Sequence, residues 1–298
     1  MSIDFSGRVA IITGAGGGLG RQHALALAAR GAKVVVNDLT PDGPGAPSAA
    51  AVVAEICAAG GTAMASQASV TDEAAVAAMV QQALDAWGRV DILVNNAGIL
   101  RDKSFSKMSM ADFRLVLDVH LMGAAICCQA VWATMRAQKY GRIVMTSSSS
   151  GLWGNFGQAN YGAAKMALVG LMQTLSIEGT KDGIRVNCLA PTAATRMTEG
   201  LLPPPVLALL KPEAVTPGLL HLVSEEAPTR AILCAGAGTF ARAYITMTGG
   251  LHLGHAADTA ERVAASFDAI SDRSGDTVPD DGSAQGRNEI GLAMSAAR

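Results

Sequence analysis

The chain has 298 residues and a formal net charge of −2, and half of its residues are hydrophobic. This hydrophobic fraction excludes disorder over most of the length and provides for a large buried core. The near-neutral charge argues against nucleic acid as a partner, because nucleic-acid binding needs a basic surface.

The cysteines show no metal-ligand spacing and their number is odd: Cys57, Cys127, Cys128, Cys188 and Cys234. No secretory signal opens the sequence, and no run of 18 apolar residues is present. The sequence therefore predicts reduced thiols, no metal site, no membrane span and a cytoplasmic location.

Short apolar runs with little alternation read as strands buried on both faces: Arg8–Thr13, Lys33–Asp38, Asp91–Asn96, Arg142–Ser147, Ile184–Ala190 and Ala231–Gly236. Helical windows lie between them: Arg21–Arg30, Glu73–Trp87, Met110–Gln138 and Tyr161–Gly179. This alternation predicts the α/β class, with a doubly wound parallel sheet and right-handed crossovers. Such a sheet binds ligands at the carboxyl ends of its strands.

Three segments interrupt this alternation. Thr40–Ser48 reads as a Pro/Gly loop. Leu201–Gly218 combines apolar residues with five prolines, which favours a mobile apolar lid over a core element, and we place the lid at about residues 199–230. Residues 256–298 are polar and read as a C-terminal extension of a single domain, residues 1–255, formed by a helix and then a loosely held segment, rather than as a second domain.

The first predicted strand runs directly into TGAGGGLGR, Thr13–Arg21, and a helix follows. Gly14, Gly18 and Gly20 allow a tight turn and bring helix N–H groups close to a pyrophosphate. A glycine pattern alone is weak evidence, but the preceding strand and the following helix match a Rossmann-type dinucleotide site. The sequence therefore predicts a dinucleotide cofactor.

The second predicted strand ends at Asp38, 18 residues after Gly20. A carboxylate there accepts hydrogen bonds from both ribose hydroxyls of the adenosine and repels a 2′-phosphate. The alternative is a solvated loop aspartate. Arg21 would suit NADP, but arginine is common at helix starts. The predicted cofactor is NAD.

Tyr161 and Lys165 lie four residues apart at the start of a predicted helix, so their side chains share a face. A free tyrosine has a pKa near 10, and lowering it by ~3 units requires ~4 kcal/mol of phenolate stabilisation. A lysine ammonium and a positive nicotinamide ring in a poorly solvated cleft provide this stabilisation together. Tyr161 is therefore the predicted acid/base. Without the glycine motif, an exposed Tyr–Lys pair would be the default.

TGAGGGLG, NNAG at Asn95–Gly98, the serine-rich strand end and YGAAK occur in the order found in the short-chain dehydrogenases/reductases. The chain resembles this family from about residue 5 to 250. In the family the catalytic serine lies thirteen residues before the tyrosine, which is Ser148 here. The resemblance implies that Ser148 hydrogen-bonds the substrate carbonyl oxygen and that Lys165 also holds the nicotinamide ribose.

The same resemblance implies the rest of the cofactor site. The expected contacts are Thr13, Gly14, Gly18, Leu19, Gly20, Asp38, Ser69, Val70, Asn96, Ala97, Gly98, Tyr161, Lys165, Pro191, Thr192 and Thr195. Ser69 stands where many relatives have an aspartate near the adenine, so the backbone is expected to make that contact. Thr192 follows Pro191 where many relatives have Pro-Gly.

One departure concerns the catalytic residues. The family usually has an asparagine that relays protons through water to the lysine, and His120 occupies that position here. Either the imidazole replaces the amide in the relay, so that His120 is a fourth catalytic residue, or His120 is a structural histidine, buried and hydrogen-bonded within the protein.

Further stretches include NNAGILRDKSF at Asn95–Phe105, DVHLMG at Asp118–Gly123 and APTAATRMT at Ala190–Thr198. With these stretches, the sequence looks most like the (3R)-hydroxyacyl-CoA dehydrogenase domains of peroxisomal multifunctional enzymes of type 2. The implied function is NAD-dependent interconversion of a secondary hydroxyl and a ketone on (3R)-3-hydroxyacyl-CoA. Alternatives are a hydroxysteroid dehydrogenase, a 3-oxoacyl-carrier-protein reductase, or a non-catalytic NAD-binding regulator. Arg101, Lys103 and Lys107 either meet CoA phosphates or form a solvated basic face.

Two predicted helices, Met110–Gln138 and Tyr161–Gly179, carry more apolar residues than one buried face requires. Family members pair through the corresponding helices, so a homodimer or homotetramer is expected. The alternative is that the additional apolar face packs against the C-terminal tail.

Overall fold

The computed structural model describes residues 3–39, 48–194 and 203–297. The chain forms two compact units, Met1–Arg242 and Ala243–Arg298. The first unit therefore ends before residue 255, where the sequence places the end of the domain. It contains every candidate site residue.

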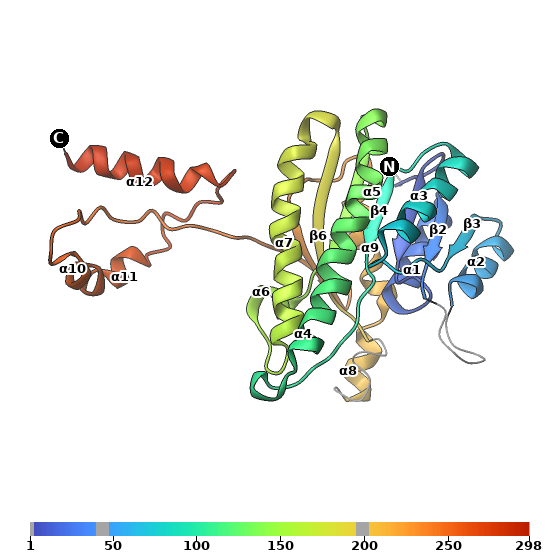
Figure 1. The fold of residues 1–298 in the computed structure, drawn as a ribbon, viewed down its shortest axis with the longest axis horizontal. Helices are drawn as coiled ribbons and strands as arrows, with labels where there is room; N and C mark the ends of the chain where they lie inside the picture. Colours follow the sequence, from blue (N-terminus) through green and yellow to red (C-terminus); the bar gives the residue numbers. More distant parts are fainter. Residues whose placement is uncertain (1–2, 40–47, 195–202, 298) are drawn as a thin grey trace. The chain divides into compact units, whose positions relative to one another are not determined.

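The first unit is built on an eight-stranded sheet with the order β3-β2-β1-β4-β5-β6-β7-β8 (Figure 1). Every described strand pair from β3 to β7 is parallel. The strands are β1 Val9–Thr13, β2 Lys33–Asn37, β3 Thr62–Ser66, β4 Ile92–Asn95, β5 Gly141–Thr146, β6 Ile184–Thr192, β7 Ile232–Gly236 and β8 Thr239–Ala243. The α/β, doubly wound Rossmann-type sheet expected from the sequence is confirmed.

Helices cover both faces of this sheet. On one face, alternate strand residues such as Ile12 and Val36 form a core with Leu27, Ile56 and Leu219. The core helices there are α1 Gly18–Ala28, α2 Ala49–Ala58 and α9 Thr216–Leu222. The other face carries α3 Glu73–Trp87, α4 Met110–Leu117, α5 Gly123–Gln138 and α7 Ala159–Gly179. Figure 1 shows α4, α5 and α7 lying across the sheet.

Several elements were not predicted from the sequence, among them β3, α2 and β8. β3 reads TAMAS and lies at the sheet edge, and most of it is partly exposed, so it lacks the apolar run of a central strand. α2 directly follows the Pro/Gly loop, and Ser48 caps it by accepting a hydrogen bond from the Ala51 N–H at 3.2 Å. β8 follows β7 after Ala237 and Gly238, whose φ angles of 49° and 72° match a two-residue hairpin turn.

The predicted helix Met110–Gln138 is not one regular α-helix. A π-helical turn at Asp118–Met122 separates α4 from α5, and it carries His120. By length and composition this run could cross a membrane. In the fold, however, it packs against α3, α7 and the sheet, as the core helix of a globular unit does.

The predicted lid has two different parts. Leu209, in α8 at Pro204–Leu209, is 67% exposed and fits a lid. Val215 and Leu219, by contrast, are fully buried in the core. His23 of α1 hydrogen-bonds the Thr216 hydroxyl through Nδ1 at 3.0 Å and so fixes α9. The expectation of a lid is therefore wrong for the segment around α9, because α9 covers the sheet. Residues 195–202 lie outside the described residues.

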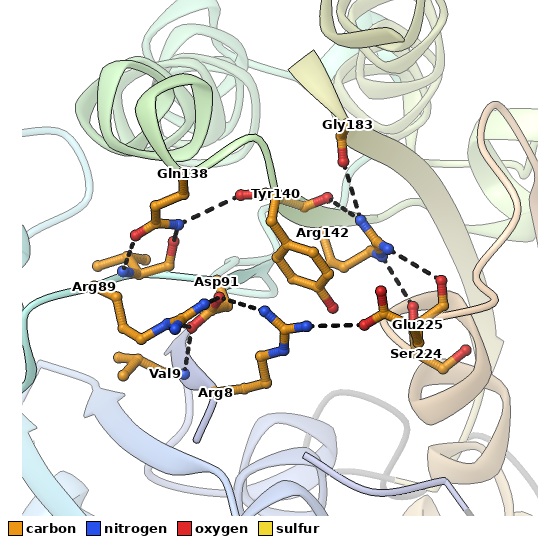
Figure 2. A network of polar contacts seen from close by, with 12 residues as sticks. Arg8, Val9, Arg89, Asp91, Gln138, Tyr140, Arg142, Gly183, Ser224 and Glu225 are labelled. Carbon is orange, nitrogen blue, oxygen red and sulfur yellow. Dashed lines mark hydrogen bonds and ion pairs between the residues drawn. The ribbon is translucent and has the colours of Figure 1, made fainter. Parts of the chain in front are cut away.

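Asp91, just before β4, is a buried anion at the amino edge of the sheet (Figure 2). Its carboxylate accepts hydrogen bonds from the Val9 N–H at 2.9 Å and from Arg8 Nη1 at 3.2 Å. Arg89 binds the same carboxylate in a bidentate manner, at 2.7 and 2.6 Å. One carboxylate therefore joins the starts of β1 and β4.

The same network continues to β5 and to the chain after α9. The Tyr140 ring lies between the guanidinium groups of Arg8 and Arg142, at 3.6 and 4.1 Å from the ring centroid (Figure 2). Arg142 Nε donates to the Ser224 carbonyl at 2.9 Å, and Arg8 pairs with Glu225 at 2.9 Å. This edge therefore stabilises the sheet on the side opposite to the candidate site.

The second unit, Ala243–Arg298, contains the helices α10 Thr259–Ala265, α11 Phe267–Ile270 and α12 Ser283–Ala296. These helices have no buried residues among those described. The segment is thus more regular than the loosely held extension that the sequence suggests.

Candidate active site

The candidate residues gather at the carboxyl edge of the parallel sheet. Strand register aligns Thr13 with Asn37, Asn95 with Met145, and Thr146 with Leu189. The loops that leave these strands therefore start at the same edge. This is where an open α/β sheet binds its ligand.

The glycine loop after β1 fits a dinucleotide. Gly17 precedes α1 in an extended conformation, and no side chain caps the first N–H groups of this helix, which leaves them available to an anion. Gly14 has a φ of +63°, and a Cβ there would lie 2.7 Å from the Ala97 Cα. A Cβ at Gly20 would lie 2.3 Å from the Gly14 carbonyl oxygen. Close packing of the loop therefore requires these glycines.

Thr13 and Asn96 hold this loop against the end of β4. The Thr13 hydroxyl oxygen accepts hydrogen bonds from the N–H groups of Asn96 and Ala97, at 3.0 and 3.1 Å. The Asn96 amide donates to the carbonyls of Thr13 and Gly14, at 3.0 and 2.9 Å. Both side chains are thus used within the protein and shape the cofactor cradle.

Asp38 lies directly after β2, beside the glycine loop. Its Oδ2 accepts a hydrogen bond from the Gly16 N–H at 2.7 Å. A Cβ at Gly16 would lie 2.8 Å from the same oxygen, so glycine permits the contact. Arg21, the residue that would suit NADP, instead pairs with Glu55 at 2.6 Å. The carboxylate is therefore held against the glycine loop, at the carboxyl end of β2.

Ser148 and Tyr161 lie within hydrogen-bonding reach of each other. Ser148 precedes the short helix α6, Ser149–Trp153, and caps it by accepting from the Ser150 N–H at 3.2 Å. Burial raises the pKa of Tyr161, the hydrogen bond with Ser148 lowers it, and the charge of Asp102 raises it further. The protein alone therefore keeps Tyr161 protonated, and the lowered pKa expected from the sequence needs the positive charge of an oxidised nicotinamide.

Lys165 is a buried lysine that lies one helical turn after Tyr161 in α7. Its Nζ lies 5.4 Å from the Tyr161 ring centroid and donates to the Thr146 carbonyl at 2.6 Å. Burial lowers the pKa of Lys165 to about 7. The Ser147 hydroxyl donates to the Lys165 carbonyl at 2.9 Å and fixes the helix against the strand end. Lys165 can therefore take up and release protons near neutral pH.

His120 contacts both Tyr161 and the NNAG loop. Its ring meets the Tyr161 ring edge-on, with centroids 5.3 Å apart. Nε2 lies 2.9 Å from the Ile99 carbonyl oxygen and 3.1 Å from the Ile99 N–H. An amide satisfies both groups at once, whereas one ring nitrogen satisfies only one of them. A Cβ at Gly98 would lie 2.2 Å from the His120 ring.

His120 also lines a small cavity. Nδ1 is buried and has no hydrogen-bond partner among the described residues. Burial and the charge of Lys165 lower the pKa of His120 to about 3, so the ring is neutral. The cavity is about 10 Å³, close to the smallest volume that holds one water. It is lined by both His120 and Lys165, with Thr13, Asn95 and Ala97.

Two residues near Tyr161 were not predicted from the sequence. Asn160 is fully buried, accepts from the Tyr161 N–H at 2.7 Å and donates to the Arg101 carbonyl at 3.1 Å. Gln158 accepts from the Ser150 hydroxyl at 2.7 Å and donates to Asp102 at 2.6 Å. Polar residues on both sides of the YGAAK motif were the available signal, but their partners lie some 60 residues away in the chain.

The other residues predicted to bind the cofactor make fewer contacts that bear on a cofactor site. The Ser69 hydroxyl hydrogen-bonds the Thr71 hydroxyl at 2.9 Å, and Val70 lines the small cavity. Pro191 and Thr192 end β6 beside β7. Thr195 lies outside the described residues. No group of three or more His, Cys, Asp or Glu side chains suited to a metal occurs in the described part of the chain.

The chain is similar to one peroxisomal enzyme both in sequence and in structure. Peroxisomal multifunctional enzyme type 2 of Drosophila melanogaster is 55% identical over 225 residues, 74% of this chain and 37% of that enzyme. Its full-length structure matches with a TM-score of 0.83 at 38% identity, covering 99% of this chain and 51% of that chain. This chain therefore spans about half or less of that enzyme's length.

Two other relatives concern the cofactor and the substrate. A structure of 7α-hydroxysteroid dehydrogenase complexed with NADH and 7-oxo glycochenodeoxycholic acid matches with a TM-score of 0.71 at 31% identity, covering 79% of this chain and 95% of that chain. The (2S)-((R)-hydroxy(phenyl)methyl)succinyl-CoA dehydrogenase subunit of Thauera aromatica is 44% identical over 184 residues, 62% of this chain and 72% of its own length.

A family model described as short chain dehydrogenase matches residues 8–203, which is more than half of the chain. The match covers the glycine loop, Ser148, Tyr161 and Lys165. The family uses a nicotinamide cofactor, and the cradle described above fits one. The chain therefore belongs to the short-chain dehydrogenase family and is an oxidoreductase.

Proposed function

We propose that this oxidoreductase uses NAD to interconvert a (3R)-3-hydroxyacyl-CoA and the corresponding 3-oxoacyl-CoA. The observation that carries the proposal is the joint placement of Ser148, Tyr161 and Lys165 beside the glycine loop. The substrate class is supported by the likeness to the multifunctional enzyme and by a relative named as a CoA-thioester dehydrogenase.

In the oxidative direction, the Tyr161 phenolate accepts the proton of the substrate hydroxyl. Ser148 donates a hydrogen bond to the same oxygen and stabilises it as it becomes a carbonyl. The bound nicotinamide supplies the acceptor for the hydride that leaves the substrate carbon. The proton then passes from the Tyr161 Oη toward Lys165 Nζ, which exchanges protons near neutral pH because burial lowers its pKa to about 7.

We also propose that His120 continues this relay. His120, whose Nδ1 has no partner among the described residues, and Lys165 line the same small cavity, and one water there would connect the two groups. Replacing His120 with leucine is expected to lower kcat by about tenfold to a hundredfold and to shift its pH dependence, because the route for the proton is lost. The measurement is kcat as a function of pH.

His120→Asn is the matched control, since an amide bonds both Ile99 groups and retains a polar route. It should keep kcat within a few-fold of the native enzyme. Equal pH profiles for His120→Leu and the native enzyme would show that His120 only packs.

The choice of NAD over NADP rests on Asp38 and Arg21. Asp38 presents a carboxylate next to the glycine loop, and Arg21 is paired with Glu55. A 2′-phosphate would therefore meet a negative charge without a free cation at α1.

The proposed function is tested by following NADH formation from (3R)- and (3S)-3-hydroxyacyl-CoA of medium chain length and from 17β-estradiol. Each substrate is offered with NAD and with NADP. Turnover of the R-thioester with NAD alone is the expected result. If the steroid is oxidised and neither thioester is, the acyl-CoA substrate class is wrong and hydroxysteroids are the substrates.

A homo-oligomer is part of the same proposal. Large apolar side chains remain exposed on α4, the π-turn and α7: Met110, Leu115, Met122, Met166 and Ile177. These residues lie on the two long helices that the sequence associates with pairing. A second copy of the chain would remove this surface from water.

A further inference from the structure

Two loops that leave the sheet after β4 and β5 lie side by side next to Tyr161. The Lys103 N–H donates to the Gly157 carbonyl at 2.9 Å, and Gln158 donates to Asp102 at 2.6 Å. We call the pair of segments 101–107 and 153–157 the rim. Asn160 anchors the rim to the tyrosine, because it bonds both the Arg101 carbonyl and the Tyr161 N–H.

The rim exposes three aromatic side chains to solvent. Phe156 is 90% exposed, Trp153 68% and Phe105 67%. Aromatic rings contribute large contact areas at ligand sites, and leaving several of them in water on one short stretch of surface needs a reason. Trp153 ends α6, the five-residue helix that Ser148 caps, so the rim is continuous with the segment that carries a proposed reacting group.

The rim is also rich in cations. Lys103 and Lys107 are exposed and have no ion pair among the described residues. Arg101 is within 3.9 Å of Asp112, and its side chain is half exposed. These three cations outnumber the carboxylates of Asp102 and Asp112 in a chain whose net charge is −2. The rim can therefore attract phosphate groups.

We propose that the rim binds the adenosine 3′,5′-bisphosphate end of CoA, and this inference rests on the proposed function. Adenine would stack on the exposed rings, and Lys103 and Lys107 would pair with the phosphates. The flexible pantetheine arm would then carry the thioester to Ser148 and Tyr161.

The rim is separate from the site of the cofactor's own adenosine. Asp38 follows β2, whereas the rim follows β4 and β5, and β1 lies between β2 and β4 in the sheet. The two nucleotides would therefore approach the sheet edge from different sides. A carrier-protein substrate has no nucleotide, so the rim distinguishes acyl-CoA from an acyl-carrier protein.

The experiment compares one (3R)-3-hydroxyacyl group carried by CoA with the same group on N-acetylcysteamine, which has no nucleotide. The readout is the ratio of the two kcat/KM values. For the native enzyme the ratio should strongly favour CoA. Lys103→Glu, Lys107→Glu and Phe156→Ala should each reduce it by about tenfold, mainly through the KM of the CoA thioester. These side chains are exposed, so the variants should fold.

Lys181→Glu is the matched control, because Lys181 is exposed just before β6, at the opposite edge of the sheet. It should leave the ratio unchanged. If the native enzyme oxidises both thioesters equally well, or if the rim variants lower both values equally, the rim is not a CoA site although the proposed reaction stands. If neither thioester is oxidised, the proposed function fails and the rim assignment fails with it.

Discussion

Replacing Tyr161 with phenylalanine is expected to lower kcat by about 10²–10⁴-fold, because the hydroxyl proposed to exchange the substrate proton is lost. The ring itself remains, so its edge-on contact with His120 is kept. The measurement is steady-state turnover of the best substrate with NAD, at saturating concentrations of both.

Two controls separate chemistry from folding in this variant. The NAD affinity, measured by calorimetry, should change little, and the unfolding temperature should stay close to that of the native enzyme. Ser148→Ala provides a second check, since loss of one hydrogen bond to the reacting oxygen should also reduce kcat, by about 10²–10³-fold. Unaltered activity of Tyr161→Phe would support the alternative of a non-catalytic NAD-binding regulator.

Replacing Asp91 with asparagine is expected to lower the free energy of unfolding by about 2–3 kcal/mol. Asp91 is fully buried, and its carboxylate serves two arginines and one backbone N–H at the amino edge of the sheet. Asparagine can still accept from the Val9 N–H but carries no charge for Arg8 and Arg89. Thermal unfolding should show a midpoint lower by roughly 4–10 °C.

Glu178→Gln is a suitable reference for this measurement, because Glu178 is exposed on α7 and the same charge is removed. It should shift the midpoint by less than about 2 °C. A similar shift for both variants would indicate that net charge, rather than the buried network, controls stability.

Much of the fold follows from local patterns. The central strands β1, β2, β4 and β5 are nearly continuous apolar runs, and burial on both faces produces this signal without knowledge of the partners. β3 was not predicted because this edge strand of small residues has neither a continuous apolar run nor an alternation of apolar and polar residues. The prolines before α9 suggested a lid, so the sequence did not predict that α9 belongs to the core. Its burial against α1 depends on tertiary packing, which a local pattern does not show.

In the candidate site, too, some features can be predicted from the sequence and others depend on the assembled fold. Glycines, Asp38, Tyr161 and Lys165 are predictable because their chemistry requires fixed residue types at fixed spacings. The contacts of His120 with Ile99, and of Gln158 with Asp102, join segments far apart in the chain. No spacing encodes them. The pKa of Lys165 likewise depends on burial, which only the assembled fold defines.

The π-turn at Asp118–Met122 means that the helix holds one residue more than a regular α-helix would in the same length. Each residue of an α-helix turns the side-chain direction by about 100°, so this added residue changes the direction of every side chain that follows. α4 and α5 can thus present unrelated faces while their axis stays almost continuous.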